Sequence, residues 1–376
     1  MNLRLEWRCS LKDEDFPAAA YEQLCDASPQ ATPFNRLAWL RGAEQVLSKR
    51  QRLQVLLGWD QQELVLCLPL IHCRERKAGW PVQVVRHLGF PLSDRFALLV
   101  SPKAEQSMPC VLREIRKQLP HALLQLSELV SVAPLLQDWK TASSYSDTRI
   151  SCRAPELLLN PAGYGVTADK SLAYKLRRAT KRCVDIGAQI KRISPNVSDI
   201  DAVLDAIIQV EQASWKGEEG LGIFSGDDRK HWMRTALRGL AEQDRVRVVL
   251  MEHEGRCISY RLGLFDKGRL YDYNLAYLPE YSNLSSGRLL LDEWIRWGLD
   301  AGWTYIDASR VSLHDSTHQL HERMSGLVEH ERWSFYSWRP TGLALGLADR
   351  LWQMAKPRLK QWRDYRAERF KEEQQA

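Results

Sequence analysis

Residues 273–309, YNLAYLPEYSNLSSGRLLLDEWIRWGLDAGWTYIDAS, decide how the second half of this chain folds. The stretch opens with the end of a strand predicted at 269–277, in which alternate side chains point to opposite faces. A polar loop, a helix at 288–300 and a short strand at 303–308 follow. The pattern therefore predicts a strand, a loop containing Ser-Ser-Gly-Arg, a helix and a further strand, in that order.

The loop before the predicted helix has the chemistry of an anion site. The first turn of a helix carries backbone N–H groups without partners and a partial positive charge. Gly287 has no Cβ to hold a phosphate away from these groups. Hydroxyl donors and a fixed positive charge come from Ser285, Ser286 and Arg288. Serine and glycine are also good helix caps, so a plain capped helix and a diphosphate site both remain open.

Outward from this stretch the sequence predicts a mixed unit of strands and helices. Strands at 245–251, 256–265 and 269–277 are joined by the short turns EHEG and DKG, which favours an antiparallel meander. Three helices are predicted before the meander, at 170–187, 199–215 and 228–242. The first is basic and amphipathic, and it is either a solvated packing helix or a positive lip beside an anionic ligand.

The first half also mixes helices and strands. We expect a helix at 33–47 capped by Asn35, and a hairpin made of 53–58 and 63–71. Further strands are expected at 82–90, 96–102 and 122–130, with a helix at 110–118. Residues 139–150 are polar and typical of turns, and we place a domain boundary near residue 161.

The composition is that of an ordinary globular protein and excludes collagen, long disorder and low complexity. The length of 376 residues suggests two domains or one large one. No apolar run is long enough to span a membrane, and the charged N-terminus MNLRLEWRCSLKDEDF does not resemble a signal peptide. We therefore expect a cytoplasmic protein. A net charge of +6 fits anionic small molecules or surfaces but is too small to indicate nucleic acid by itself.

Cysteines and histidines give weaker signals. The eight cysteines match no zinc or disulfide framework, which predicts buried, reduced thiols. His314, His318 and His321 are spaced to share one face of a helix. They could form a polar helix face, one of them could face the substrate, or together they could bind a transition metal. Of these three roles, we do not expect the metal site.

Several of these segments together resemble a known family. Residues 211–224, EQASWKGEEGLGIF, the three-strand meander and residues 273–309 are similar to the acetyltransferase domain of the BioF2-like/CelD type, which belongs to the GNAT superfamily and is related to FemAB-like transferases. The resemblance covers about residues 155–340. The helix KLRRATKRCVDIGAQI looks like the basic helix of that family, and PFNRLAWL with the strands near 63–100 looks like its degenerate first half.

The resemblance implies an α+β fold of two tandem GNAT-like domains, each a mostly antiparallel twisted sheet flanked by helices, plus a C-terminal helix. We expect a degenerate domain at 1–160, an acyl-CoA-binding domain at 161–340 and an amphipathic basic tail at 341–376. The implied activity is acyl transfer from acyl-CoA, foremost acetyl-CoA, to an amine of a sugar, amino acid or polysaccharide precursor, in a bacterial cell. In the family, the CoA diphosphate lies in the loop that here contains Ser285, Ser286, Gly287 and Arg288.

In such a fold, the strands at 269–277 and 303–308 should diverge and expose backbone N–H groups that polarise the thioester carbonyl. We predict Asp307 and His314 as acceptors of the proton of the attacking amine, and Tyr273 or Tyr281 as the donor to the leaving thiolate. The predicted substrate contacts are Trp215, Lys216, Asn274 and Arg310. Relatives often carry a glycine-rich stretch with an aromatic–lysine pair after the strand near Asp307, and this chain does not.

Two other functions remain open. A FemAB-like enzyme would take its aminoacyl group from charged tRNA, and the basic stretch at 170–182 would bind the RNA. A non-catalytic protein would bind or support a polysaccharide synthase. The tail at 341–376 mixes basic and acidic residues with apolar ones. It could dock on the body, pair with a partner such as a synthase complex, or lie on a membrane surface.

Overall fold

The computed structural model describes residues 3–130, 133–159, 169–308, 310, 323 and 325–375. The strands of its first half are β1 (Arg4–Arg8), β2 (Gln51–Asp60), β3 (Glu63–Lys77), β4 (Trp80–His87), β5 (Leu99–Val100), β6 (Leu123–Val130) and β7 (Tyr145–Leu158). The helices of this half are α1 (Ala18–Ala27), α2 (Leu37–Gln45), α3 (Met108–Gln118) and α4 (Ala133–Ala142), with short 3-10 helices η1 (Pro33–Asn35) and η2 (Pro102–Ser107).

The second half contains the elements predicted around the deciding stretch. Its strands are β8 (Gln189–Ile193), β9 (Val246–His253), β10 (Arg256–Asp266), β11 (Arg269–Tyr277), β12 (Tyr305–Asp307) and β13 (Gly326–Tyr336). Its helices are α5 (Lys170–Asp185), α6 (Ile200–Gln212), α7 (Trp215–Glu218), α8 (Asp227–Ala241), η3 (Pro279–Leu284), α9 (Ser286–Asp300) and α10 (Pro340–Gln375). The antiparallel meander of β9, β10 and β11 is confirmed.

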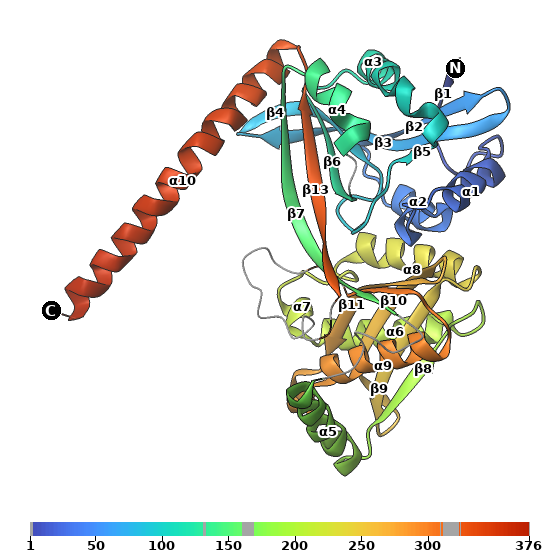
Figure 1. Cartoon of the computed structure of the whole chain (residues 1–376), viewed down its shortest axis with the longest axis vertical. Coiled ribbons are helices and arrows are strands. Elements are labelled where there is room, and N and C mark those ends of the chain that lie inside the picture. The colour runs from blue at the N-terminus through green and yellow to red at the C-terminus, as the bar shows by residue number, and fades with distance from the viewer. Residues whose placement is uncertain are drawn as a thin grey trace.

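Within the described residues, the strands of both halves form one 13-stranded sheet. Its order is β1-β2-β3-β4-β6-β13-β7-β12-β11-β10-β9-β8, and β5 pairs with β3. The last strand, β13, lies between β6 and β7, while the far end of β7 pairs with β12. Figure 1 shows β7 and β13 running side by side from one half to the other. The mixed α+β fold with a mostly antiparallel sheet is confirmed, with the strands of both halves joined in one sheet.

The core also continues across the two halves. Helix α2 of the first half packs on α8 of the second, where the rings of Trp39 and Trp232 lie 5.9 Å apart. The close approach depends on two glycines, because a Cβ on Gly42 would lie 2.8 Å from the Trp232 ring and a Cβ on Gly239 would lie 2.9 Å from that of Ala38. The two halves are therefore packed without a hydrated gap at this crossing.

Two parts of the first half differ from the sequence-based expectation. The helix predicted at 33–47 begins only at Leu37, because the side chain of Asn35 holds the η1 turn and the backbone of Ala97. Residues 139–150 are not irregular, since they form the end of α4 and the start of β7. The polar start of β7 becomes a strand by pairing with β13, which is far away in the sequence.

The C-terminal tail is helical, as predicted. In Figure 1, α10 projects away from the body, and only its first turns approach β7 and β13. Arg149 of β7 forms an ion pair with Asp349 at 2.8 Å. Around and beyond this point α10 exposes large apolar side chains, among them Leu347, Leu351, Trp352 and Met354. No helix in the described part of the chain has the length and apolar character needed to cross a membrane.

Candidate functional site

Strands β11 and β12 pair only over a short length. Their parallel ladder joins residues 269–271 to 305–307 and ends at Tyr271 and Asp307. From Asp272 to Tyr277, β11 has β10 on one side and, within the described residues, no strand on the other. Among the described residues, Asp272–Tyr277 of β11 therefore form an open edge of backbone groups in the middle of the sheet. The divergence that the family resemblance implies concerns residues after Asp307, most of which lie outside the described part of the chain, and it stays a prediction.

A β-bulge lies at this open edge. The register between β10 and β11 shifts between Leu262 and Gly263, which leaves Tyr273 as an extra residue between Asp272 and Asn274. The strict alternation predicted along this strand is therefore wrong from Tyr273 onward. Bulges redirect side chains and are frequent beside active sites. No local sequence signal marked this one.

The start of α9 is open at the end of the same strand. Ser285 precedes the helix in the left-handed conformation (φ 56°), and its side chain makes no capping hydrogen bond. A Cβ added to Gly287 would meet no atom within 4 Å. Ser286 is buried, whereas Ser285, Gly287 and Arg288 are half-buried. Ser285 thus provides no side-chain cap, and among the described residues there is room for a Cβ at Gly287.

A buried ion pair fixes this helix start to the sheet. Arg261 of β10 donates from Nε and Nη2 to the carbonyl oxygen of Gly287, at 3.1 and 2.9 Å. Its Nη1 pairs with Asp272 at the open edge. Burial raises the pKa of Asp272, and the Arg261 guanidinium opposes that shift. The first turn of α9 is thus positioned by a charge pair of which both partners are almost fully buried.

The opposite face of the sheet carries a second polar cluster. Tyr260 and Arg261 are consecutive on β10, so their side chains point to opposite faces. On the Tyr260 side, Asn274 donates to Glu211 of α6 at 2.5 Å and to the Tyr260 hydroxyl at 2.9 Å. Lys216 of α7 donates from Nζ to the Asn274 side-chain oxygen at 2.5 Å. The structure therefore brings two predicted substrate contacts, Lys216 and Asn274, together at the open edge.

The side chain of Lys216 is partly removed from water. Burial lowers the pKa of Lys216, and the negative charges of Glu211, Asp272 and Asp94 oppose the shift. Trp215, the neighbouring predicted contact, is 47% exposed. This side of the open edge therefore combines a hydrogen-bonding ammonium group with an accessible aromatic surface.

Asp307 is held by the first half of the chain. Both of its carboxylate oxygens accept from Arg95, which lies in the loop after β4, and both residues are buried. An oxygen pair occupied by a guanidinium is poorly placed to accept a proton from an amine. Sequence reasoning missed Arg95 because it lies more than two hundred residues away and belongs to no recognisable motif.

Arg310 and Asp94 extend this network at the junction of the halves. Arg310, the fourth predicted substrate contact, donates to Asp94 at 3.1 Å and to Glu128 of β6 at 3.2 Å. Asp94 also pairs with Arg95 at 3.2 Å. Burial raises the pKa of Asp94, and the two arginines oppose the shift. The carboxylate of Asp94 lies where the two halves of the chain meet, and the sequence did not single it out.

The predicted proton donors lie in different surroundings. Tyr273 is buried against Phe34 and Trp39 of the first half, and its hydroxyl donates to the Leu92 carbonyl at 2.9 Å. Burial raises the pKa of Tyr273 well above its ordinary value. Tyr281 of η3 is half-buried, with its hydroxyl 3.0 Å from Nδ1 of His253. His314, His318 and His321 lie outside the described residues.

One group of described side chains has metal-ligating atoms close together. Ligand atoms of Glu128, Cys152 and His330 all lie within 4.8 Å of one another. However, Cys152 donates to one oxygen of Glu128 at 3.1 Å, and Arg310 binds the other. Burial raises the pKa of the Cys152 thiol to about 12. These contacts describe a hydrogen-bonded core cluster, and like the other seven cysteines Cys152 is a free thiol.

An antiparallel meander, a short parallel pairing of β11 with β12, and a helix that starts close to the end of that pairing lie together in this part of the chain. Residues 170–335 match the family described as "Acetyltransferase (GNAT) domain". This part of the chain is therefore similar to the acetyltransferase domains of the GNAT superfamily.

Solved structures share the fold over nearly the whole chain. FemX has a TM-score of 0.59 at 10% identity, and the match covers 93% of this chain and 99% of FemX. A conserved protein of unknown function from Bacteroides thetaiotaomicron has a TM-score of 0.53 at 9% identity, with 86% and 99% covered. L-PGS from Bacillus licheniformis has a TM-score of 0.51 at 12% identity, with 89% and 96% covered. At these identities the similarity concerns the fold. A comparison with curated protein sequences found no match.

Proposed function

We propose that this protein transfers an acyl group, foremost acetyl, from acyl-CoA to the amine of a sugar, amino acid or polysaccharide precursor in the cytoplasm. The observation that carries the proposal is the open start of α9 beside the unpaired edge of β11. A helix start of this kind offers backbone N–H groups and a partial positive charge to a diphosphate. Ser285, Ser286, Gly287 and Arg288 are the proposed diphosphate contacts.

The two polar clusters suggest how donor and acceptor meet. With its diphosphate at α9, the pantetheine arm would follow the gap between β11 and β12, so that the thioester reaches the edge beyond Tyr271. Backbone N–H groups there would stabilise the negative charge that develops on the carbonyl oxygen. The acceptor would approach from the opposite face, where Lys216 and Asn274 lie.

In the proposed reaction, the amine attacks the thioester carbon, a C–N bond forms and the C–S bond breaks. The amine gives up a proton, and the CoA thiolate takes one. Both oxygens of Asp94 accept from arginines, as do both oxygens of Asp307, so neither carboxylate is well placed to take this proton. We therefore assign no side chain to the first step.

The proposal is tested by calorimetry with acetyl-CoA, followed by an assay of thiol release with amine acceptors. We expect saturable binding, and we expect Arg288→Ala to raise the apparent CoA dissociation constant severalfold. Arg113→Ala, an exposed cation on α3 of the first half, is the matched control and should bind as the wild type does. Equal binding by the wild type and Arg288→Ala would remove this residue from the site, and no binding by the wild type would refute the donor assignment.

FemAB-like transfer from charged tRNA is the second candidate. It is favoured by one observation, the similarity to the FemX fold over almost the entire chain. Incubation with acyl-CoA in one reaction and with aminoacylated tRNA in another distinguishes the two donors. Acyl transfer seen only with charged tRNA would replace the first proposal by the second. Failure of both, together with absent CoA binding, would support a non-catalytic role.

A further inference from the structure

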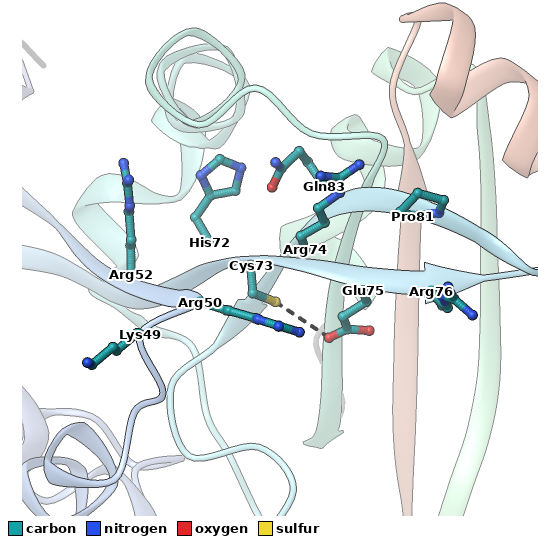
Figure 2. A pocket seen from close by; sticks show the side chains of 10 residues that line it. All are labelled: Lys49, Arg50, Arg52, His72, Cys73, Arg74, Glu75, Arg76, Pro81 and Gln83. Atoms are coloured by element: carbon teal, nitrogen blue, oxygen red, sulfur yellow. Dashed lines mark hydrogen bonds between the residues drawn. The ribbon is translucent and has the colours of Figure 1, made fainter.

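A separate concave site lies in the first half of the chain. It is a cleft of about 700 Å³ where β2 begins and where the hairpin of β3 and β4 extends past it. Its lining residues are Lys49, Arg50, Arg52, His72, Cys73, Arg74, Glu75, Arg76, Pro81 and Gln83. Figure 2 shows these side chains around the strands. The volume falls within the range of about 300–1,000 Å³ typical of pockets for small ligands.

The cleft has an unbalanced positive charge. Five of its lining residues are basic and exposed, and in the part of the chain that the structure describes none forms an ion pair: Lys49, Arg50, Arg52, Arg74 and Arg76. Its one acid, Glu75, is bound by Arg86 through both oxygens, at 2.6 and 2.7 Å, and by Lys77 at 3.2 Å. Burial acts to raise the pKa of Glu75, but these cations hold it at about 2. Glu75 therefore does not neutralise the five.

Strand pairing places Arg52 and Arg74 near each other on one face of the sheet. Arg52 of β2 is paired with His72 of β3, and Arg74 follows two residues after His72, on the same face. The first residue of β2, Gln51, pairs with Cys73, so residues 74–77 of β3 have β4 on one side and no described strand on the other. The cleft therefore combines guanidinium groups with an unpaired backbone edge. Both are donors that suit phosphate oxygens.

We propose that this basic cleft binds the diphosphate or triphosphate group of a soluble small ligand, at a site separate from the proposed donor site at α9. Guanidinium groups bind phosphate in a bidentate manner, and Figure 2 shows Arg52 and Arg74 on the same side of the strands. The lining offers no Phe, Tyr or Trp on which bases of a nucleic acid would stack. The ring of His72 is already fixed by the Pro120 carbonyl, at 3.0 Å from Nε2.

The test is calorimetric titration of the full chain with inorganic pyrophosphate and with inorganic triphosphate at two salt concentrations. We expect saturable binding that weakens at higher salt, because the cleft is open to water. The double variant Arg52→Gln/Arg74→Gln should weaken binding at least tenfold. The control Lys12→Gln/Arg113→Gln removes the same charge from exposed positions outside the cleft and should stay within twofold. Unchanged thermal midpoints verify that both variants fold.

Four results would overturn the proposal. The first is the absence of saturable binding, and the second is equal weakening in the control, which would show an effect of net charge alone. The third is a loss of binding in Arg288→Ala but not in the cleft variant, which would place the anion at α9. The fourth is binding of RNA or of phosphatidylglycerol vesicles without binding of triphosphate. Because the cleft and α9 variants are independent, failure here leaves the acyl-CoA proposal intact.

Discussion

Replacing Gly287 with alanine should separate the stability of the proposed donor site from its function. Gly287 lies in the first turn of α9, and an added Cβ would meet no atom within 4 Å. Alanine is favoured over glycine in a helix, so the free energy of unfolding should rise by between 0 and about 1 kcal/mol. The same Cβ would project into the space that the diphosphate must enter. We expect acetyl-CoA to bind at least tenfold more weakly, a loss of about 1.4 kcal/mol.

Urea unfolding measures the first quantity and calorimetry with acetyl-CoA the second. Gly287→Val should weaken binding further, because the added side chain is larger. Gly79→Ala should show the opposite result, a loss of stability without a loss of binding. Gly79 also has open space around it, but its φ is +82°, a conformation that alanine adopts only with strain. That variant should lose about 1 kcal/mol of stability with unchanged CoA affinity. Wild-type affinity in both Gly287 variants would refute the assignment of the diphosphate to α9.

Three further predictions concern the junction of the halves and the buried histidines. Arg95→Met removes the guanidinium that binds both oxygens of the buried Asp307 carboxylate and should lower the free energy of unfolding by about 3–5 kcal/mol, measured in urea. A loss under about 1 kcal/mol would show that the pair is not structural. Tyr273→Phe removes one hydrogen bond to Leu92 and should lower the free energy of unfolding by about 1 kcal/mol without changing kcat. A tenfold drop in kcat at unchanged stability would instead support the predicted role of Tyr273 as a proton donor. Burial lowers the pKa of three histidines to about 4, namely His87, His121 and His330. Their pKa in the unfolded chain is about 6.5, so the unfolded state binds more protons between these values and stability should fall by about 2 kcal/mol per histidine from pH 7 to 5. A flat profile of urea midpoints over that range would contradict this.

Much of the second half can be predicted from sequence because its signals are local. The short turns between β9, β10 and β11 force neighbouring strands to pair. The apolar stripe of α5 is buried at Leu172, Leu176 and Ala179, as its helical spacing indicates. Ser285 precedes α9, and Ser286, Gly287 and Arg288 form its first turn, two residues earlier than the predicted start at 288, so the chemistry of this helix start can be read without tertiary contacts.

The remaining features depend on contacts that the sequence does not encode locally. The partner of Asp307 comes from a loop of the first half, and no spacing rule connects the two positions. The bulge at Tyr273 arises from the register between β10 and β11, so the faces of Asp272 and Asn274 could not be assigned from alternation. The polar start of β7 is a strand only because β13 lies beside it.

The position of β13 between β6 and β7 has a consequence for how substrates enter. Hinge motion of two lobes about a linker is common in enzymes, but here it would have to break the backbone hydrogen bonds that join β13 to β6 and to β7 on either side of a β-bulge. Access must therefore be controlled by small adjustments of the loops at the gap beside β11. For the same reason, the two halves expressed as separate polypeptides would each lack a strand that the other supplies, so we expect them to regain activity only when they are mixed.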